Sequence, residues 1–522
     1  MTIDWRSLED QTLHPGGKVT LVGAGPGSAS LLTLRGKECL ERAEVAFVDR
    51  LVGSELLHFL PSTCEVVDVG KREGHHPVPQ QTINRWIEQA ARAGLEVVRL
   101  KGGDPYIFGR GGEELEGLLA RGIPFEVVPG ITSSIACASY AGIPLTHRGL
   151  SQSFHVITAH AKANEDPKVP YEALVATGGT LVFLMGVSAL AAIQKGLLLA
   201  GMDPCLPAAI VERGTHPAQR KVLAPLRDLA QAAQRASIVS PAIVIVGKVA
   251  ALSESLDWFS HRPLHGKKVV VTRAREKASE LRRSLEELGA QVLEVPSIKS
   301  RSLPAPADGA ALWPTFGQSA QWLVFTSARG VQGFFEWLDA AALDARALSL
   351  CRFACVGRET ALALKEHGLR ADLVPQTYSG EALAQELIAQ RRPEERVLIL
   401  RAKEGSATLT EALTAAGIAY REIPVYETLW DPGAVRLEQA SACDAITFAS
   451  AATVEGFCRS YPTFDPHSMP AICIGEQTAK AARGKGFNPI LSQKATMDSM
   501  AACVKEVLTH DDDPTSPASA QQ

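Results

Sequence analysis

The stretch Lys101-Gly-Gly-Asp-Pro-Tyr-Ile-Phe-Gly-Arg-Gly-Gly-Glu-Glu114 follows directly on Val97–Leu100, a run typical of a buried strand. Two adjacent glycines at a strand end allow a ligand to approach the backbone closely. Asp104 could accept hydrogen bonds from an amine or a ribose, but it could equally cap a helix after a tight turn. For an isolated Gly-Gly-Asp the tight turn is the favoured interpretation, so the surrounding sequence has to decide.

Strand-like runs recur throughout the chain, and helical patterns separate them. Gly or Pro punctuates the ends of these runs. The runs of the first half are Val19–Val22, Val45–Val48, Val97–Leu100, Phe125–Val128 and Phe154–Thr158. The alternation predicts an α/β fold with largely parallel sheets.

Composition limits the class of protein. The chain has 522 residues, 46% of them apolar and 21% charged, with a net charge of −4. At roughly 100–200 residues per domain, three or four compact units are expected. The charge argues against a nucleic-acid partner, and no run reaches the roughly 18 apolar residues of a membrane span. The N-terminus lacks the apolar core of a signal peptide, so we expect a cytoplasmic protein with no membrane partner.

Two candidate metal motifs are weak. Cys351 and Cys355 are the only close pair among ten cysteines, and neither a second pair nor histidines lie nearby in the sequence. His75 and His76 are adjacent on a predicted loop, where they lack chelating geometry. We expect no metal.

A domain boundary is predicted after the strand-like run Ile243–Val249 and before a fresh one, Lys268–Thr272. The polar, proline-containing C-terminus predicts disorder. The expected organisation is an N-terminal extension (1–16), a first unit of two lobes (17–252), a linker (253–266), a second unit of two lobes (267–508) and a disordered tail (509–522).

The second half contains an internal repeat. Three pairs of segments align in the same order: 269–298 with 397–426, 325–331 with 448–454, and 356–361 with 474–479. Repetition at this length indicates a duplicated α/β unit rather than a solenoid. The second half is therefore expected to form two lobes.

The motif Val22-Gly-Ala-Gly-Pro-Gly27 lies between a strand and a helical pattern, where a dinucleotide fingerprint would lie. Asp49 follows the next strand, in the place of a ribose-binding acid. Against this, Ser28 replaces the third glycine, and Pro26 removes an N–H that pyrophosphate would need. A nucleotide-cofactor site and a plain tight turn are equally favoured by this motif alone.

From Lys18 to about Val249 the chain closely resembles the uroporphyrinogen-III C-methyltransferases, which are tetrapyrrole methylases. The matching motifs occur in the family's order and are 22–27, 49–52, 70–72, 98–113, 128–133, 140–148 and 213–215. The resemblance implies S-adenosyl-L-methionine as methyl donor and a homodimer formed through this half.

The resemblance also implies roles for individual residues. The expected donor contacts are Pro26, Gly102, Gly103, Asp104, Ile107, Thr132, Ser133, Met185 and Gly214. Without the resemblance, Met185 would be interpreted as plain core. Asp49 and Lys71 match positions used for proton transfer, which this chemistry needs because a methylated pyrrole must lose a proton. A basic rim of Arg72, Arg110 and Arg148, with Lys71, would suit a substrate with eight carboxylates, although each could be merely solvated.

In the second half, hydroxyl residues stand where strands give way to helices. Such helix N-termini have free N–H groups that suit carboxylates, although ordinary caps are the favoured interpretation for any single residue. The residues are Thr326, Ser327, Thr360, Ser450 and Thr478.

The arrangement from about Lys267 to Val507 resembles the uroporphyrinogen-III synthases. The matching signatures are 271–273, 323–327, 355–360, 424–426 and 474–478. The resemblance implies two chain crossings between lobes, near 295–300 and 423–428, and cyclisation of hydroxymethylbilane with Tyr426 assisting loss of the hydroxyl. We therefore expect an α/β enzyme with a two-lobed methylase and a two-lobed duplicated synthase, making precorrin-2 for siroheme or cobalamin. Two alternatives are a methylase that acts on another corrinoid or on a protein, and a methylase with a non-catalytic, tetrapyrrole-sensing second half.

Overall fold

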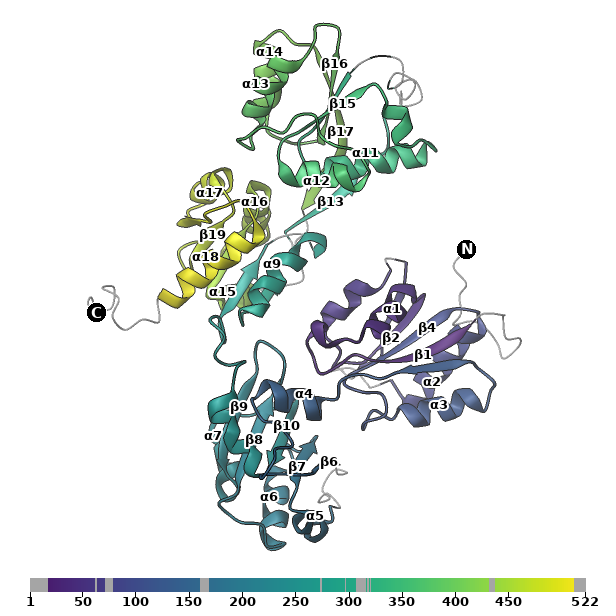
Figure 1. The fold of residues 1–522 in the computed structure, drawn as a ribbon, viewed down its shortest axis with the longest axis vertical. Coiled ribbons are helices and arrows are strands. Elements are labelled where there is room, and N and C mark those ends of the chain that lie inside the picture. The colour runs from purple at the N-terminus through teal and green to yellow at the C-terminus, as the bar shows by residue number, and fades with distance from the viewer. Residues whose placement is uncertain are drawn as a thin grey trace, which may run out of the picture. The chain divides into compact units, whose positions relative to one another are not determined.

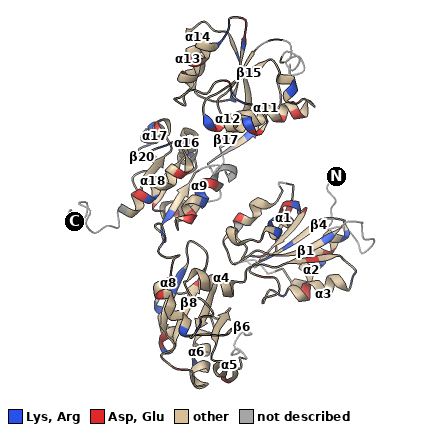
Figure 2. Ribbon diagram, viewed as in Figure 1, with Lys and Arg blue, Asp and Glu red and all other residues tan. Residues whose placement is uncertain are grey.

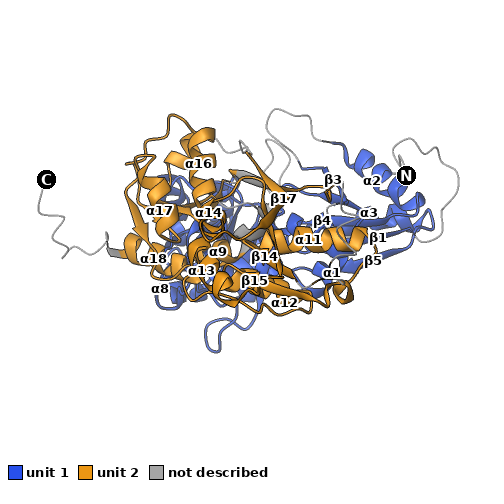
Figure 3. Cartoon of the chain, turned by 90° about the horizontal axis from the view of Figure 1, so that it is seen from above, with its two compact units in different colours: residues 1–266, 286–291 blue, residues 267–285, 292–522 orange. Residues whose placement is uncertain are grey.

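The computed structural model describes residues 17–61, 63–70, 78–159, 169–272, 275–295, 297–306, 316, 319, 321–430 and 437–510 (Figure 1). Acidic and basic residues are interspersed in all parts of the chain, in keeping with its small net charge (Figure 2). The chain forms two compact units, residues 1–266 with 286–291 and residues 267–285 with 292–522 (Figure 3). Among the described residues no helix is long and apolar enough to cross a membrane.

The first lobe of the first unit is a parallel sheet with the strand order β3-β2-β4-β1-β5. Its strands are β1 (Lys18–Gly23), β2 (Val45–Val48), β3 (Glu65–Asp68), β4 (Glu96–Lys101) and β5 (Phe125–Val128), and its helices are α1 (Leu34–Arg42), α2 (Gln80–Arg92) and α3 (Gly111–Leu119). Apolar side chains pack on both faces of the sheet, in one core with α2 and α3 and in another with α1. This is the burial that a central parallel sheet requires.

The second lobe differs from the largely parallel sheet expected. Its order is β6-β7-β10-β8-β9, and only β6 and β7 are parallel. Residues 213–219 join β8 to β9 in a short turn, which can connect only antiparallel neighbours. The elements are α4 (Ser133–Tyr140), β6 (Phe154–Thr158), α5 (Tyr171–Thr177), β7 (Thr180–Leu184), α6 (Leu190–Leu199), β8 (Pro207–Glu212), β9 (Arg220–Pro225), α7 (Leu229–Arg235), β10 (Ala242–Val246) and α8 (Ser253–Leu256).

The segment predicted as a linker, 253–266, is packed structure. It begins with α8, and its Asp257 forms an ion pair with Lys221 at 2.5 Å. The indole Nε1 of Trp258 donates to the backbone oxygen of Ser139 at 3.2 Å. Arg262 lies over the ring of Phe259, 3.7 Å from its centre. Aromatic residues in this segment give it a core contact that composition alone did not reveal.

The second unit contains two five-stranded sheets, β12-β11-β18-β19-β20 and β13-β17-β16-β14-β15. The duplicated segments occupy equivalent strands in the two sheets, since β12, β11, β18 and β19 correspond in order to β17, β16, β14 and β15. The strands are β11 (Lys268–Val271), β12 (Gln291–Glu294), β13 (Ile298–Ser302), β14 (Gln321–Phe325), β15 (Cys351–Cys355), β16 (Arg396–Ala402), β17 (Tyr420–Trp430), β18 (Ala445–Phe448), β19 (Ala471–Cys473) and β20 (Pro489–Leu491). The predicted α/β fold class is confirmed.

Helices connect these strands. They are α9 (Arg275–Glu287), α11 (Ala328–Ala340), α12 (Arg358–Glu366), α13 (Gly380–Gln390), α14 (Thr408–Ala415), α15 (Leu437–Ser441), α16 (Ala451–Ser460), α17 (Glu476–Arg483) and α18 (Met497–His510). The chain passes between sheets after β12 and again after β17. At the second passage, predicted near 423–428, residues 426–430 of β17 pair antiparallel with β13.

Candidate functional site

Three glycine-containing loops meet at the ends of the parallel strands in the first lobe. A Cβ on Gly130 would lie 2.2 Å from the backbone oxygen of Gly103, and a Cβ on Gly23 would lie 2.4 Å from the backbone nitrogen of Gly130. Gly25 and Gly103 exchange two backbone hydrogen bonds, of 3.1 and 2.7 Å. Gly103 also has a positive φ of 69°. Only glycine allows three backbones to approach this closely, so the loops form a wall of bare peptide groups.

Asp104 ties these loops together. Its Oδ2 accepts a hydrogen bond of 3.0 Å from the N–H of Gly130, and its Oδ1 accepts one of 2.8 Å from the N–H of Tyr106. Asp104 therefore accepts backbone hydrogen bonds within its turn, as the tight-turn interpretation of the sequence expects. A carboxylate has about four acceptor positions, so these two bonds leave capacity for a ligand.

The loop that follows is exposed and strained. Tyr106, Ile107 and Phe108 are all exposed, and Phe108 and Arg110 have positive φ angles of 54° and 58°. Such backbone strain in non-glycine residues concentrates at functional sites. The Arg110 guanidinium pairs with Glu113 at 2.5 Å, and hydrogen bonds from Arg110 lower the pKa of that carboxyl. Arg110 thus has an internal partner, which a substrate carboxylate would have to replace.

The remaining predicted donor contacts come from three segments. Thr132 and Ser133 begin α4, and Gly214 packs so closely on that helix that a Cβ would lie 2.4 Å from the Cβ of Cys137. Met185 is 47% exposed and has a φ of 55°, so its interpretation as plain core is wrong. The N–H of Ser28, two residues after Pro26, donates to the hydroxyl of Thr215 at 3.4 Å, which brings the first glycine loop to the second lobe.

Asp49 stands where β2 ends, next to the glycine loops. Its side chain is one-third exposed, and Oδ1 lies 2.7 Å from Nη2 of the buried Arg99. Arg148 is exposed. Lys71 and Arg72, predicted for proton transfer and substrate binding, lie outside the described residues.

In the second unit, Ser327 and Tyr426 are brought together by α11 and β17. Ser327 is the N-cap of α11, and its Oγ accepts from the N–H of Gly330 at 3.1 Å. The same Oγ lies 3.1 Å from the hydroxyl of Tyr426. Thr326, immediately before the cap, is half-buried. The tyrosine hydroxyl is therefore held at a helix N-terminus.

The other predicted hydroxyl residues behave differently. Ser450 is an ordinary cap, in a reciprocal capping box with Thr453. Thr360 and Thr478 are each only 4% exposed, so little of either residue is accessible to a large substrate. They lie one turn inside α12 and α17, whose N-caps are Gly357 and Gly475. Sequence spacing placed them near the helix start but did not show which face they occupy.

Comparison with known proteins separates the two halves. Residues 18–230 match the family model of Tetrapyrrole (Corrin/Porphyrin) Methylases, and residues 279–502 match that of Uroporphyrinogen-III synthase HemD. Over 497 residues, 94% of this chain and 98% of the relative, the sequence is 42% identical to the porphyrin biosynthesis protein HemD of Ruminiclostridium josui. The chain belongs to the tetrapyrrole methylases in its first half and to the uroporphyrinogen-III synthases in its second. It therefore joins two enzyme families of tetrapyrrole biosynthesis.

Two further relatives match the methylase half. The siroheme synthase 2 of Cronobacter sakazakii is 48% identical over 256 residues, which are 49% of this chain and 55% of the relative, so this chain covers about half the length of that protein. The crystallised uroporphyrin-III C-methyl transferase from Thermus thermophilus, complexed with S-adenyl homocysteine, is 42% identical. The match covers 45% of this chain and 93% of that one, with a TM-score of 0.39.

Sequence reasoning missed a buried group of charges in the methylase half. Arg99, Lys101 and Glu114 are each less than 5% exposed and lie in contact with one another. The signal was present, because two cationic side chains, Arg99 and Lys101, stand two residues apart around and after the apolar residues of the run Val97–Leu100. In the middle strand of a parallel sheet such residues must be buried, and buried charges need partners.

Proposed function

We propose that the synthase half cyclises hydroxymethylbilane to uroporphyrinogen III and that the methylase half adds two methyl groups to this product from S-adenosyl-L-methionine, giving precorrin-2. The observation that carries the methylase assignment is the close approach of the loops of Gly23, Gly103 and Gly130 at the strand ends, where a Cβ on Gly23 or Gly130 would collide with the neighbouring backbone. A bulky adenosine cofactor needs such bare backbone. Precorrin-2 made in this way could enter either siroheme or cobalamin synthesis.

In this proposal the bound donor supplies an electrophilic methyl group on sulfur. A reduced pyrrole carbon would form a bond to this methyl as the carbon–sulfur bond breaks and S-adenosylhomocysteine leaves, and the methylated ring would then have to lose a proton. Asp49 takes that proton as general base, since its side chain is partly exposed beside the glycine loops. Lys71 serves as proton donor or neutralises an acetate group. Arg72, Arg110 and Arg148 bind substrate carboxylates, and two copies of the chain pair through their methylase halves.

In the synthase half, Tyr426 assists departure of the substrate hydroxyl. Ser327 Oγ accepts a hydrogen bond from the N–H of Gly330, and in this proposal its own hydroxyl donates to the oxygen of Tyr426. That arrangement leaves the tyrosine proton free to be donated to the leaving group. The folded conformer of the bilane is held by its carboxylates, which is an orientation effect.

A direct test uses the intact protein with uroporphyrinogen III and labelled S-adenosylmethionine, with NAD binding measured in parallel. We expect two labelled methyl groups per macrocycle and binding of S-adenosylmethionine but not NAD. Binding of NAD without S-adenosylmethionine would instead restore the dinucleotide interpretation of Val22–Gly27.

Replacing Ser327 by alanine separates capping from catalysis. Loss of the cap should cost about 1 kcal/mol of unfolding free energy. The Ser379→Ala variant is a matched control, because Ser379 caps α13 in the same way, accepting from Ala382 at 3.1 Å. We expect both variants to lose similar stability but only Ser327→Ala to cyclise hydroxymethylbilane more slowly. Equal cyclisation rates in the two variants would remove Ser327 from the mechanism.

A further inference from the structure

Four charged side chains form a continuous chain of contacts directly behind the glycine loops. Asp49 Oδ1 lies 2.7 Å from Arg99 Nη2. Arg99 Nε lies 3.4 Å from Glu114 Oε2, and the other oxygen of Glu114 lies 2.8 Å from Lys101 Nζ. Two carboxylates and two cations balance in charge, and they connect β2, β4 and α3.

Side chains in β4 point alternately to the two faces of the sheet, and this explains why the charged residues lie on one face. Val97 packs in the core with α2 and α3, so Arg99 and Lys101, at two-residue steps, emerge on the same face of the sheet. Phe47 of β2 also packs in that core, which places Asp49 on the same face of the neighbouring strand. Arg99 is anchored further by the carbonyl oxygens of Phe47 and Leu100, at 3.4 and 3.3 Å.

Stability does not account for this network. Desolvating charges costs several kcal/mol per ion, and buried ion pairs are often no more stabilising than apolar residues of similar volume. Arg99 Nε and Glu114 Oε2 are moreover buried without a hydrogen-bond partner among the described residues. Burial, with repulsion from Arg99, lowers the pKa of Lys101. An arrangement with these costs is expected where it positions a functional group.

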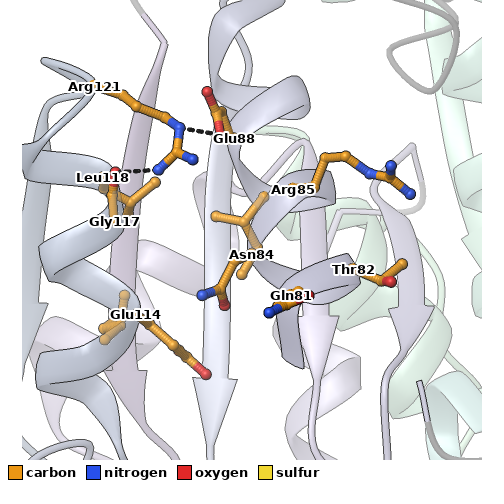
Figure 4. A pocket seen from close by; sticks show the side chains of 11 residues that line it. Gln81, Thr82, Asn84, Arg85, Glu88, Glu114, Gly117, Leu118 and Arg121 are labelled. Atoms are coloured by element: carbon orange, nitrogen blue, oxygen red, sulfur yellow. Dashed lines mark hydrogen bonds and ion pairs between the residues drawn. The ribbon is translucent and has the colours of Figure 1, made fainter. Parts of the chain in front are cut away.

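The far end of the network is buried but borders a pocket. Glu114 lines a pocket of about 580 Å³ between α2 and α3, with Gln81 and Asn84 extending from α2 beside it (Figure 4). Gln80 Nε2 donates to Glu114 Oε1 at 2.9 Å. Asp49, at the opposite end, is the member of the network whose carboxylate is partly exposed. The network therefore has one end at the candidate site and its anchoring end at the helices.

We propose that Arg99 is a positioning residue for methyl transfer: it holds the Asp49 carboxylate beside the glycine loops, and Glu114 and Lys101 fix Arg99 in turn. This rests on the proposed function, in which Asp49 is the base. Arg99 does not contact substrate in this account. Arg99 affects the rate of methyl transfer only through Asp49, so a double-mutant cycle of the two residues tests the proposal.

The experiment compares Arg99→Met, the charge-balanced Arg99→Met/Glu114→Gln, and the control Arg85→Met, each with and without Asp49→Asn. Arg85 lines the same pocket but is exposed and lies outside the network. Methyl transfer to uroporphyrinogen III is measured as kcat and KM, with the Kd of S-adenosylmethionine. Misplacement of the base should lower kcat on the order of 10²-fold with KM and Kd little changed. In the Asp49→Asn background, loss of Arg99 should change kcat by less than about twofold.

The outcomes separate the two proposals. Absence of methyl transfer by the unaltered protein would refute the proposed function before any variant is compared. If the unaltered protein is active and the losses from Arg99→Met and Asp49→Asn simply multiply, Arg99 is a structural residue and the positioning role is wrong. Should Arg99→Met fail to fold, the charge-balanced double variant decides the question by the same comparison.

Discussion

The Asp49→Asn variant is expected to transfer methyl groups ~10²–10⁴-fold more slowly than the unaltered protein, because an amide cannot take the proton that the methylated pyrrole must lose. Binding of S-adenosylmethionine should be unchanged, since the glycine loops keep their backbone bonds. Single-turnover methyl transfer and equilibrium binding of the donor measure the two quantities separately.

Asp68→Asn is the matched control for this substitution. Asp68 also ends a strand of the same sheet, and its Oδ1 accepts from the N–H of Gly70 at 2.9 Å, a bond that asparagine can keep. Its methyl transfer should match that of the unaltered protein. A folded Asp49→Asn variant that retains the full rate would assign the base to another residue, with Lys71 the next candidate.

The second large effect is expected at Gly130. In Gly130→Ala the new Cβ would lie 2.2 Å from the backbone oxygen of Gly103, and backbone cannot rotate away as a side chain can. One of the two loops must move, at a cost of about 1–3 kcal/mol. Because about 1.4 kcal/mol corresponds to a factor of ten, the affinity for S-adenosylmethionine should fall roughly 10- to 100-fold.

Gly112→Ala tests whether such a loss is specific. Gly112 lies in α3, close in sequence to the same loops, and a Cβ there would meet nothing within 4 Å. Alanine in a helix is favourable, so this variant should bind the donor as tightly as the unaltered protein and melt no lower. Calorimetric titration of both variants with S-adenosylmethionine gives the comparison. Undiminished affinity in Gly130→Ala would place the donor elsewhere.

Some elements of the fold leave a pattern in the sequence, and others are set by contacts or connection lengths that the sequence pattern does not show. Strands β1, β2, β4 and β5 of the first lobe were predicted, because apolar runs in a doubly covered sheet are continuous. The edge strand β3 was not predicted, since its side chains alternate between half-buried and exposed. The mostly antiparallel sheet of the second lobe was not predicted, since strand direction follows from connection lengths that the runs alone do not give. The segment 253–266 looked like a linker in composition, yet its Phe259 is buried and both Trp258 and Phe259 pack against the ring of Tyr140.

In the candidate sites, too, some features were predictable from the sequence and others were not. Motif order placed Gly103 and Asp104 at a strand end, and the structure has them there. The buried Thr360 and Thr478 show that a residue type at a helix start does not define its face. The strain at Met185 is equally invisible in sequence, because a positive φ is a property of the folded backbone. Contacts between segments far apart in the chain, such as Arg99 with Glu114, required coordinates.

One measurement tests the central claim most directly. The intact protein is incubated with hydroxymethylbilane and labelled S-adenosylmethionine, and the products are separated by isomer type and by label. Our account predicts a dimethylated macrocycle of the type III series, which needs both halves to act in sequence. An unmethylated type I macrocycle, the product of unassisted ring closure, would contradict it.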